Sequence, residues 1–198
     1  MPKLLLPKVF GIGLSRTGTK SLTVALNLLG IRARWYPHDE RTFHELLLAN
    51  YRLSILETYQ AITDTPVVPF YPQLDATYPG SKFILTVRDQ SSWLSSCARH
   101  WVNAAIPHGT DQLPRRFANY IDSAVYGCNA FNRERFTYVY DRHVSGVMEY
   151  FGQRSADLLV IDICGGEGYE KLCPFLGLPM PANSQFPKES NFQSPLLS

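Results

Sequence analysis

The sequence has neither a strong excess of one charge nor a hydrophobic run long enough to cross a membrane. Lysine and arginine together number 19 and aspartate and glutamate 17, so the formal net charge at pH 7 is only +2. A charge this small gives no support for a nucleic acid or a membrane surface as partner. No run of about 18 apolar residues is present, which predicts that no helix spans a membrane.

Secretion signals and cysteine pairs are also lacking. The apolar start of the chain is interrupted by Pro7 and Lys8, and no small-residue cleavage site follows. The four cysteines form no CxxC pair and have no metal-like spacing to histidine, so we predict no metal site: Cys97, Cys128, Cys164 and Cys173. We expect buried thiols in a soluble, cytoplasmic protein, although the spacing leaves a disulfide between two of them open.

The order of apolar runs predicts an α/β fold. Hydrophobic residues make up 45% of the 198 residues and charged residues 18%, which is typical of one folded domain, here residues 1–198. Short apolar runs bounded by turn residues are predicted strands, at 8–13, 31–35, 59–64, 82–88 and 157–162. Predicted helices lie between them, at 21–29, 42–57, 69–78, from 91, over most of 113–151, and at 168–176. Strands that alternate with helices indicate a mainly parallel sheet flanked by helices, with ligands beyond the carboxyl ends of the strands.

The turn after the first strand, residues 13–21, has the chemistry of a phosphate-binding loop. Gly13 and Gly18 allow a tight turn and a close approach of backbone to ligand. The helix that follows presents free N–H groups and the positive end of its dipole to an anion. Three hydroxyls and two cations add to this, from Thr17, Thr19, Ser21, Arg16 and Lys20. A plain strand-to-helix turn would not need this combination.

The same loop departs from the Walker A pattern. That pattern places lysine directly after the second glycine and a serine or threonine after the lysine. Here Thr19 takes the lysine position and Lys20 the hydroxyl position, so the hydroxyl that would bind magnesium is displaced. A small-molecule kinase is therefore an alternative function rather than the first.

Residues 16–21, Arg-Thr-Gly-Thr-Lys-Ser, resemble the 5′-phosphosulfate loop of sulfotransferases, which use 3′-phosphoadenosine 5′-phosphosulfate (PAPS). The resemblance implies a three-layer P-loop-type fold and a transfer that requires no metal, because a sulfuryl group carries less charge than a phosphoryl group. It assigns Arg16 to the bridging oxygen or sulfonate, as a catalytic residue. The implied nucleotide-binding residues of this loop are Ser15, Arg16, Thr17, Gly18, Thr19, Lys20 and Ser21. Arginine for the usual lysine, and Lys20 for a hydroxyl residue, are departures that keep the positive charge.

A second stretch resembles the 3′-phosphate motif of the same family. That motif places an arginine at a strand end and a serine eight residues later on the next helix, and Arg88 and Ser96 match it. Arginine can contact a phosphate through two N–H groups, and a serine on the adjacent turn can donate a hydrogen bond. Ser92 competes with Ser96 for this role, and pairing of Arg88 with Asp89 is the structural alternative.

The candidate general base is Asp64, in the sequence Ile-Thr-Asp-Thr-Pro at the end of a predicted strand. The family resemblance places a base here, and an acceptor hydroxyl must lose its proton as it attacks sulfur. The alternative reading of Asp64 is a helix N-cap. His38, His100 and His108 are weaker candidates.

The carboxyl-terminal third also resembles bacterial-type sulfotransferases, in residues 140–143, 168–177, 186–187 and 191. By loose analogy Lys188 approaches the 3′-phosphate. Residues 100–132 match no family motif; their aromatic residues are predicted as core, with the lining of an acceptor site as the alternative: Trp101, Tyr120, Tyr126 and Phe131.

These observations predict a PAPS-dependent sulfotransferase with a small-molecule or carbohydrate acceptor. A P-loop kinase and a catalytically silent nucleotide-binding or interaction module are the alternatives. The identity of the acceptor and the oligomeric state are left open by the sequence.

Overall fold

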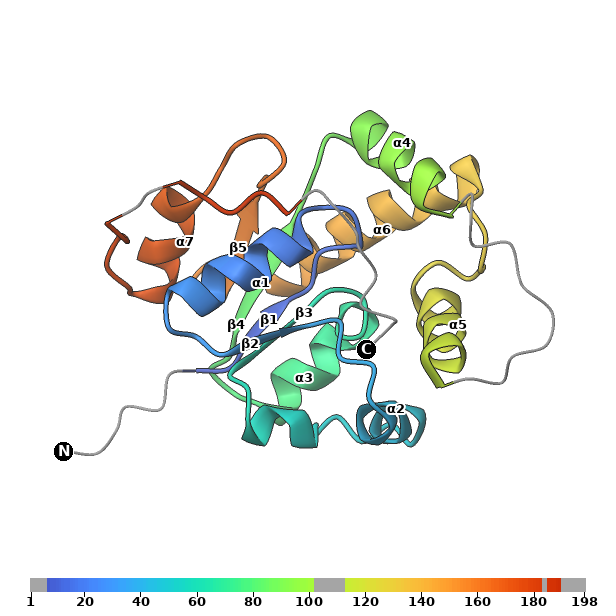
Figure 1. Cartoon of the computed structure of the whole chain (residues 1–198), viewed down its shortest axis with the longest axis horizontal. Coiled ribbons are helices and arrows are strands. Elements are labelled where there is room, and N and C mark those ends of the chain that lie inside the picture. The colour runs from blue at the N-terminus through green and yellow to red at the C-terminus, as the bar shows by residue number, and fades with distance from the viewer. Residues whose placement is uncertain (1–6, 102–112, 183–184, 190–198) are drawn as a thin grey trace.

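Five short strands form one all-parallel sheet in the order β2-β3-β1-β4-β5 (Figure 1). The computed structural model describes residues 7–101, 113–182 and 185–189, and the strands are β1 (Val9–Gly11), β2 (Ala33–Trp35), β3 (Ala61–Thr63), β4 (Lys82–Thr86) and β5 (Leu158–Ile161). The chain runs from β1 outward to β2, returns through β3, and crosses β1 to reach β4. The chain therefore builds the sheet on one side of β1 first and on the other side afterwards. The loops that follow β1 and β4 meet where this change of side occurs, which is the position where parallel sheets bind ligands.

Alternation along the strands gives the sheet two apolar faces. Phe10 and Phe83 lie on one face with ring centroids 5.4 Å apart, whereas Val9 and Ile84 belong to the cluster on the other. Successive side chains of a strand point to opposite faces, so a strand buried on both sides needs apolar residues at every position. This explains why the strands appear in the sequence as unbroken apolar runs.

Helices cover both faces, so the predicted three-layer α/β fold is confirmed. The cluster around Val9 and Ile84 contains residues of α1 (Thr19–Leu28) and α7 (Tyr169–Leu176). The cluster around Phe10 contains residues of α2 (Glu40–Leu47), α3 (Tyr71–Thr77), α5 (Leu113–Val125) and α6 (Arg133–Phe151). A third cluster joins α4 (Gln90–Trp101) to α6 around the fully buried ring of Trp93. None of the described helices is both long enough and apolar enough to cross a membrane.

One predicted helix is divided in the structure, and the mostly helical stretch 113–151 consists of two helices. The helix expected over 42–57 is α2 followed by a separate 3₁₀ turn, η1 (Ser54–Glu57), because Ala49 adopts a φ of 52° that ends α2. Within 113–151, Gly127 takes a φ of 68° and Asn132 caps α6 by accepting a hydrogen bond from the Arg135 amide at 2.9 Å. Both breaks depend on a left-handed residue or a cap, signals that hydrophobic periodicity does not carry.

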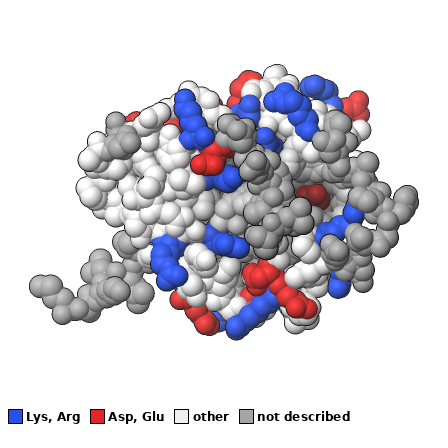
Figure 2. Space-filling model, viewed as in Figure 1, with Lys and Arg blue, Asp and Glu red and all other residues white. Residues whose placement is uncertain are grey.

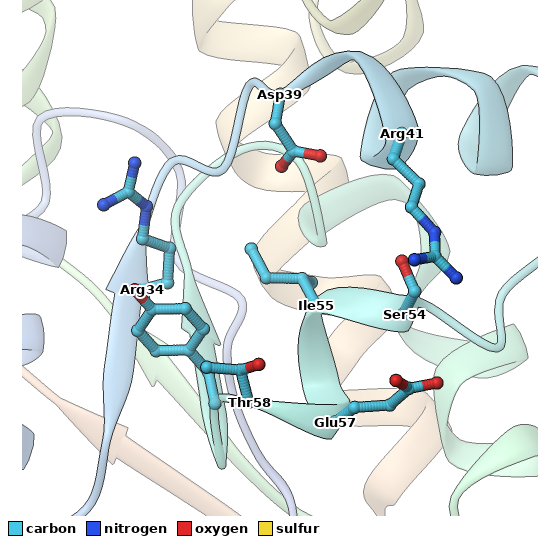
Figure 3. A pocket seen from close by; sticks show the side chains of 8 residues that line it. Arg34, Asp39, Arg41, Ser54, Ile55, Glu57 and Thr58 are labelled. Carbon is cyan, nitrogen blue, oxygen red and sulfur yellow. The ribbon is translucent and has the colours of Figure 1, made fainter.

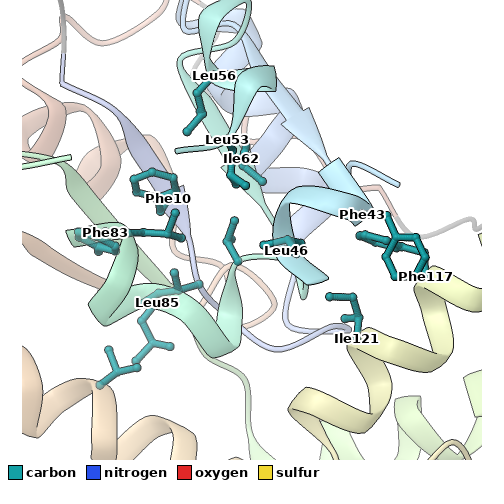
Figure 4. Packing of buried hydrophobic residues seen from close by; sticks show 14 of the residues in the cluster. Phe10, Phe43, Leu46, Leu53, Leu56, Ile62, Phe83, Leu85, Phe117 and Ile121 are labelled. Atoms are coloured by element: carbon teal, nitrogen blue, oxygen red, sulfur yellow. The ribbon is translucent and has the colours of Figure 1, made fainter. Parts of the chain in front are cut away.

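Helix α5, in the part of the chain without family motifs, packs against α2 beside the sheet (Figure 4). Phe117 is fully buried and meets Phe43 edge-on at 5.6 Å and Tyr36 edge-on at 5.7 Å. The Tyr120 hydroxyl donates to the Leu46 carbonyl at 3.2 Å, and Ile121 is also fully buried. Residues of α5 thereby become part of the main core.

Removal of the Phe117 ring is expected to destabilise the whole domain. We expect Phe117→Ala to lower the free energy of unfolding by about 3–5 kcal/mol, because the lost contacts leave a cavity between α2 and α5. Urea denaturation followed by circular dichroism measures this. Tyr138→Ala, which removes a ring that is 51% exposed on α6, serves as control and is expected to cost less than about 1 kcal/mol. A Phe117→Ala protein as stable as the control would contradict this packing.

Candidate active site

The loop after β1 is shaped by glycines that leave no room for a side chain. A Cβ atom on Gly13 would lie 1.8 Å from the Thr86 hydroxyl oxygen and 2.6 Å from the Thr86 carbonyl oxygen at the end of β4. Gly18 adopts a φ of 96°, and α1 begins immediately after it, at Thr19, with no side-chain cap. The first N–H groups of α1 are consequently directed at the loop and suited to an anion.

Hydroxyl and indole groups fasten this loop to its neighbours. The Thr17 hydroxyl lies 2.6 Å from both the Leu14 carbonyl and the Thr86 hydroxyl, and Thr17 is only 1% exposed. The Trp93 indole N–H donates to the Ser15 carbonyl at 2.9 Å. The Thr17 side chain, predicted in the nucleotide-binding set, thus holds the loop closed and does not project from it.

The two predicted anion-binding arginines lie side by side at the carboxyl edge of the sheet. Arg88 donates from Nη1 to the backbone carbonyl of Arg16 at 3.1 Å. Its Nε and Nη2 contact the Ser92 hydroxyl at 3.0 and 2.7 Å, whereas Arg16 Nε donates to Ser96 at 3.2 Å. The serine paired with Arg88 is therefore Ser92, the alternative partner, while Ser96 serves Arg16. Two arginine side chains at the same sheet edge create a positive potential that favours an anion.

One turn of α6 holds the backbones that carry these arginines. The Tyr140 hydroxyl accepts from the Arg88 amide at 3.1 Å and donates to the Arg88 carbonyl. Three residues later, His143 Nε2 lies 2.7 Å from the Ile12 carbonyl, which can only accept, so Nε2 carries the proton. Burial lowers the pKa of His143, which keeps the imidazole neutral. This family-like segment thereby positions both β1 and β4.

Asp64 occupies a buried, strained position directly after β3. Its φ is 81°, and its side chain is turned towards α1 with an exposed fraction of only 2%. The carboxylate accepts from the Thr19 hydroxyl, from the Trp35 indole at 2.8 Å and from the Thr65 amide at 2.7 Å. The alternative of a helix N-cap is not realised, because the 3₁₀ turn that follows, η2 (Val68–Phe70), begins without a side-chain cap. A non-glycine residue with φ near +80° costs free energy, and such strain is concentrated at functional sites.

The described carboxyl-terminal segment returns to the start of α1. The Glu189 amide donates to the Ser21 hydroxyl at 3.0 Å, and its carboxylate lies 3.6 Å from Lys20 Nζ. Lys188 precedes this contact and is exposed. Of the other candidate bases, the His38 ring lies 3.0 Å from the Tyr36 carbonyl, while His108 falls outside the described residues.

The family model of the sulfotransferase domain matches residues 8–194. This chain belongs to the sulfotransferase family. It is 26% identical to Ava biosynthesis cluster protein M of Aspergillus versicolor, over 91% of this chain and 79% of that protein. A solved structure, a sulfotransferase from Alicyclobacillus acidocaldarius, superposes with a TM-score of 0.56 over 96% of this chain and 87% of that one. At 17% identity, that likeness shows the shared fold alone.

A further acidic residue of this sulfotransferase was not found by sequence reasoning. Asp122 of α5 accepts a hydrogen bond from the Trp101 side chain at the end of α4, and the charge of Asp64 contributes to the raised pKa of Asp122. The charges of Asp122 and Asp64 both raise the pKa of Tyr36, which follows β2. Three elements far apart in sequence therefore bring Tyr36, Asp64 and Asp122 together. The sequence around Asp122 contains no family motif, so it gives no local signal that Asp122 lies near Asp64.

The aromatic residues of 100–132 are chiefly core in this sulfotransferase, as predicted. Trp101 is 6% exposed, and Tyr126 is fully buried and stacked on Phe136 at 4.6 Å. His100 lies close enough to Arg16 and Asp64 for their charges to act on its pKa, which burial lowers. Figure 2 shows acidic atoms at the floor of a hollow beside α5, flanked by basic side chains.

A separate hollow of about 390 Å³ lies between β2, α2 and η1 (Figure 3). Two of its charged side chains stabilise α2. The Asp39 carboxylate caps the helix by accepting a hydrogen bond from the Thr42 amide at 2.9 Å, and Arg41 forms an ion pair with Glu45 at 3.5 Å. None of the residues that line it belongs to the glycine loop. Within the described ranges, no group of three or more histidine, cysteine, aspartate or glutamate residues could hold a metal ion.

Asp122 is expected to destabilise the folded protein at neutral pH. Burial raises its pKa to about 6, the Trp101 hydrogen bond opposes this, and the charge of Asp64 adds to it. The unfolded chain loses this proton first as the pH rises from about 4 to 6, so folding stability falls across that window and stays lower above it. Asp122→Asn should therefore be more stable than wild type, by a small amount at pH 4 and by about 1–3 kcal/mol at pH 7.

Urea denaturation at both pH values measures this difference. Glu134→Gln, which removes an exposed carboxylate at the start of α6, is the control and should show no such pH-dependent gain. An Asp122→Asn variant less stable than wild type at pH 7 would show that the ionised Asp122 carboxylate does not lower the free energy of unfolding.

Proposed function

We propose that this protein transfers a sulfuryl group from PAPS to a hydroxyl or amine of a small-molecule or carbohydrate acceptor. The observation that carries the proposal is the pairing of Arg16 and Arg88 at one sheet edge, joined by the 3.1 Å hydrogen bond from Arg88 to the Arg16 carbonyl. Two adjacent guanidinium groups suit a nucleotide with anionic groups at two positions. Membership of the sulfotransferase family supports the same conclusion.

The residues present fit such a nucleotide. The cradle at Gly13 would be filled by any Cβ, and the uncapped first turn of α1 offers backbone N–H groups to an anion. We assign the 5′-phosphosulfate end to Ser15, Arg16 and residues 17–21, and the 3′-phosphate to Arg88 with Ser92 or Ser96. Lys188 stands beside the Lys20–Glu189 ion pair and is assigned to the same anionic ligand.

Asp64 is the proposed general base. PAPS supplies an activated sulfuryl group, and the attacking acceptor must give up a proton. The Asp64 carboxylate is oriented by three donors, of which Trp35 and Thr65 lie at 2.8 and 2.7 Å, and its buried setting keeps it out of bulk water. Arg16 stabilises the negative charge that develops on the leaving side, as preorganised donors do in low-dielectric sites.

A magnesium-dependent kinase fits these residues less well. Lys20 stands where the Walker pattern needs a hydroxyl, and it forms an ion pair with Glu189. Asp162, the acidic residue after β5, accepts a hydrogen bond from the Gly165 amide at 2.7 Å and so stabilises the turn that follows β5.

All four cysteines lie in described residues and are free, which supports a reducing compartment such as the cytoplasm.

Binding of the product nucleotide tests the two-anion site. Addition of 3′-phosphoadenosine 5′-phosphate at about 100 times its Kd should raise the Tm by about 5–10 °C, by mass action. ATP with magnesium should raise it far less, and Arg88→Ala should abolish the increase. Arg133→Ala, at an exposed position of α6, is the matched control and should keep it. A wild-type protein with no increase would refute the proposal.

Replacement of Asp64 by asparagine separates binding from chemistry. Because Asp64→Asn keeps the shape and an acceptor oxygen, the Tm increase with the nucleotide should remain within about twofold of wild type. Sulfuryl transfer from labelled PAPS to a panel of phenol, alcohol and amine acceptors should fall about 10²–10⁴-fold. Transfer at the wild-type rate would show that a group other than Asp64 accepts the proton of the acceptor.

A further inference from the structure

Residues 185–189, called the terminal segment below, run from the side of α7 back to the first turn of α1 (Figure 1). The Phe186 ring lies 4.8 Å from the Tyr169 ring, and a Cβ atom on Gly168 would lie 3.0 Å from a carbon of the Phe186 ring. Phe186 also packs against the apolar cluster of α1 and α7. Because three residues span at most about 11 Å, this anchor keeps Glu189 close to the start of α1.

Glu189, at the end of the terminal segment, contacts two residues that we assign to the nucleotide. Its amide donates to the Ser21 hydroxyl at 3.0 Å, and its carboxylate lies 3.6 Å from Lys20 Nζ. Both partners belong to the first turn of α1, which begins without a side-chain cap. The terminal segment therefore brings a negative charge to the helix end that we assign to the 5′ end of the nucleotide.

Lys20 connects the Glu189 carboxylate to the candidate active site. Its ammonium nitrogen lies 5.9 Å from the centre of the Trp35 ring, and the Trp35 indole donates to Asp64 at 2.8 Å. The neighbour of Lys20 in the loop, Thr19, donates to Asp64 as well. The Lys20 side chain is 36% exposed, so it lies at the open rim of the site, where a ligand from solution can reach it.

Lys20 differs from the two arginines of the site in the charge of its partner. Arg16 donates to the Ser96 hydroxyl, and Arg88 donates to the Ser92 hydroxyl and to the Arg16 carbonyl, which are neutral acceptors. Of these three cations, Lys20 alone forms an ion pair within the part of the chain that the structure describes. A carboxylate that neutralises one cation of an anion-binding set lowers the positive potential available to a ligand.

We propose that Glu189 is an internal competitor of the nucleotide, whose carboxylate holds Lys20 until the 5′-phosphate replaces it there. This rests on the proposed function. Both side chains of the ion pair are more than a third exposed, and a pair of this kind contributes little to stability, so it can be exchanged readily. The nucleotide is favoured in this exchange because its 3′-phosphate is bound at Arg88 at the same time, whereas Glu189 offers a single carboxylate.

Removal of the Glu189 charge distinguishes a competitor from a supporting contact. Glu189→Gln keeps the length of the side chain and the backbone hydrogen bond to Ser21. Calorimetric titration with 3′-phosphoadenosine 5′-phosphate should give this variant a Kd about three- to fivefold lower than that of wild type, because Lys20 becomes available to the ligand. In a Lys20→Met background, the same Glu189→Gln change should alter the Kd by less than about 1.5-fold, since the two residues act as a pair.

The control for net charge is Glu134→Gln, which removes an equal charge from an exposed position on α6 and should leave the Kd at the wild-type value. An unchanged or higher Kd in Glu189→Gln, or a decrease that persists in the Lys20→Met background, overturns the inference, because Glu189 would then not compete for Lys20. In those cases, binding of the nucleotide by the wild type still supports the proposed function. A wild-type protein that does not bind the nucleotide would instead overturn the proposed function, and the inference with it.

Discussion

The close approach of the glycine loop to the end of β4 is the constraint on which the site depends. Gly13 lies against Thr86 so tightly that a single added carbon would collide with it, and the Thr17 and Thr86 hydroxyls meet at 2.6 Å in the same place. Because β1 and β4 are adjacent in the sheet, this contact places the residues that follow each strand side by side. Arg16 and Arg88, 72 residues apart in sequence, meet for this reason.

The site divides into a cationic part and an anionic part, and different layers of the fold build them. The loop after β1 and the end of β4 carry the arginines and are held from one side by Tyr140 and His143 of α6. The carboxylates come from the end of β3 and from α5 on the other side. The loops after the central strands β1 and β4 therefore supply the cationic part, while the end of β3 and the peripheral helix α5 supply the anionic part.

Local sequence signals were sufficient for the fold and for the cationic part of the site. Apolar runs followed by glycine or arginine marked β1 and β4, and the displaced Lys20 remains the sequence argument against an ordinary magnesium-nucleotide loop. The partners of Arg88 and Arg16 could not be ranked in this way, since Ser92 and Ser96 are one helical turn apart and both face the arginines. Trp35 and Asp122 were missed because their roles arise only from packing, between β2 and β3 in the first case and through the burial of Phe117 and Ile121 in the second.

The attachment of α6 to both arginine-bearing segments also bears on the thermodynamics of ligand binding. Tyr140 and His143 belong to one rigid turn, and each holds a backbone group through a hydrogen bond that needs no ligand. The entropy of ordering these two segments is therefore lost during folding, so it does not have to be lost again when an anion arrives. For the nucleotide proposed above, a site organised in advance leaves a larger share of the interaction energy for affinity, so α6 would contribute to binding through the backbone groups that it holds.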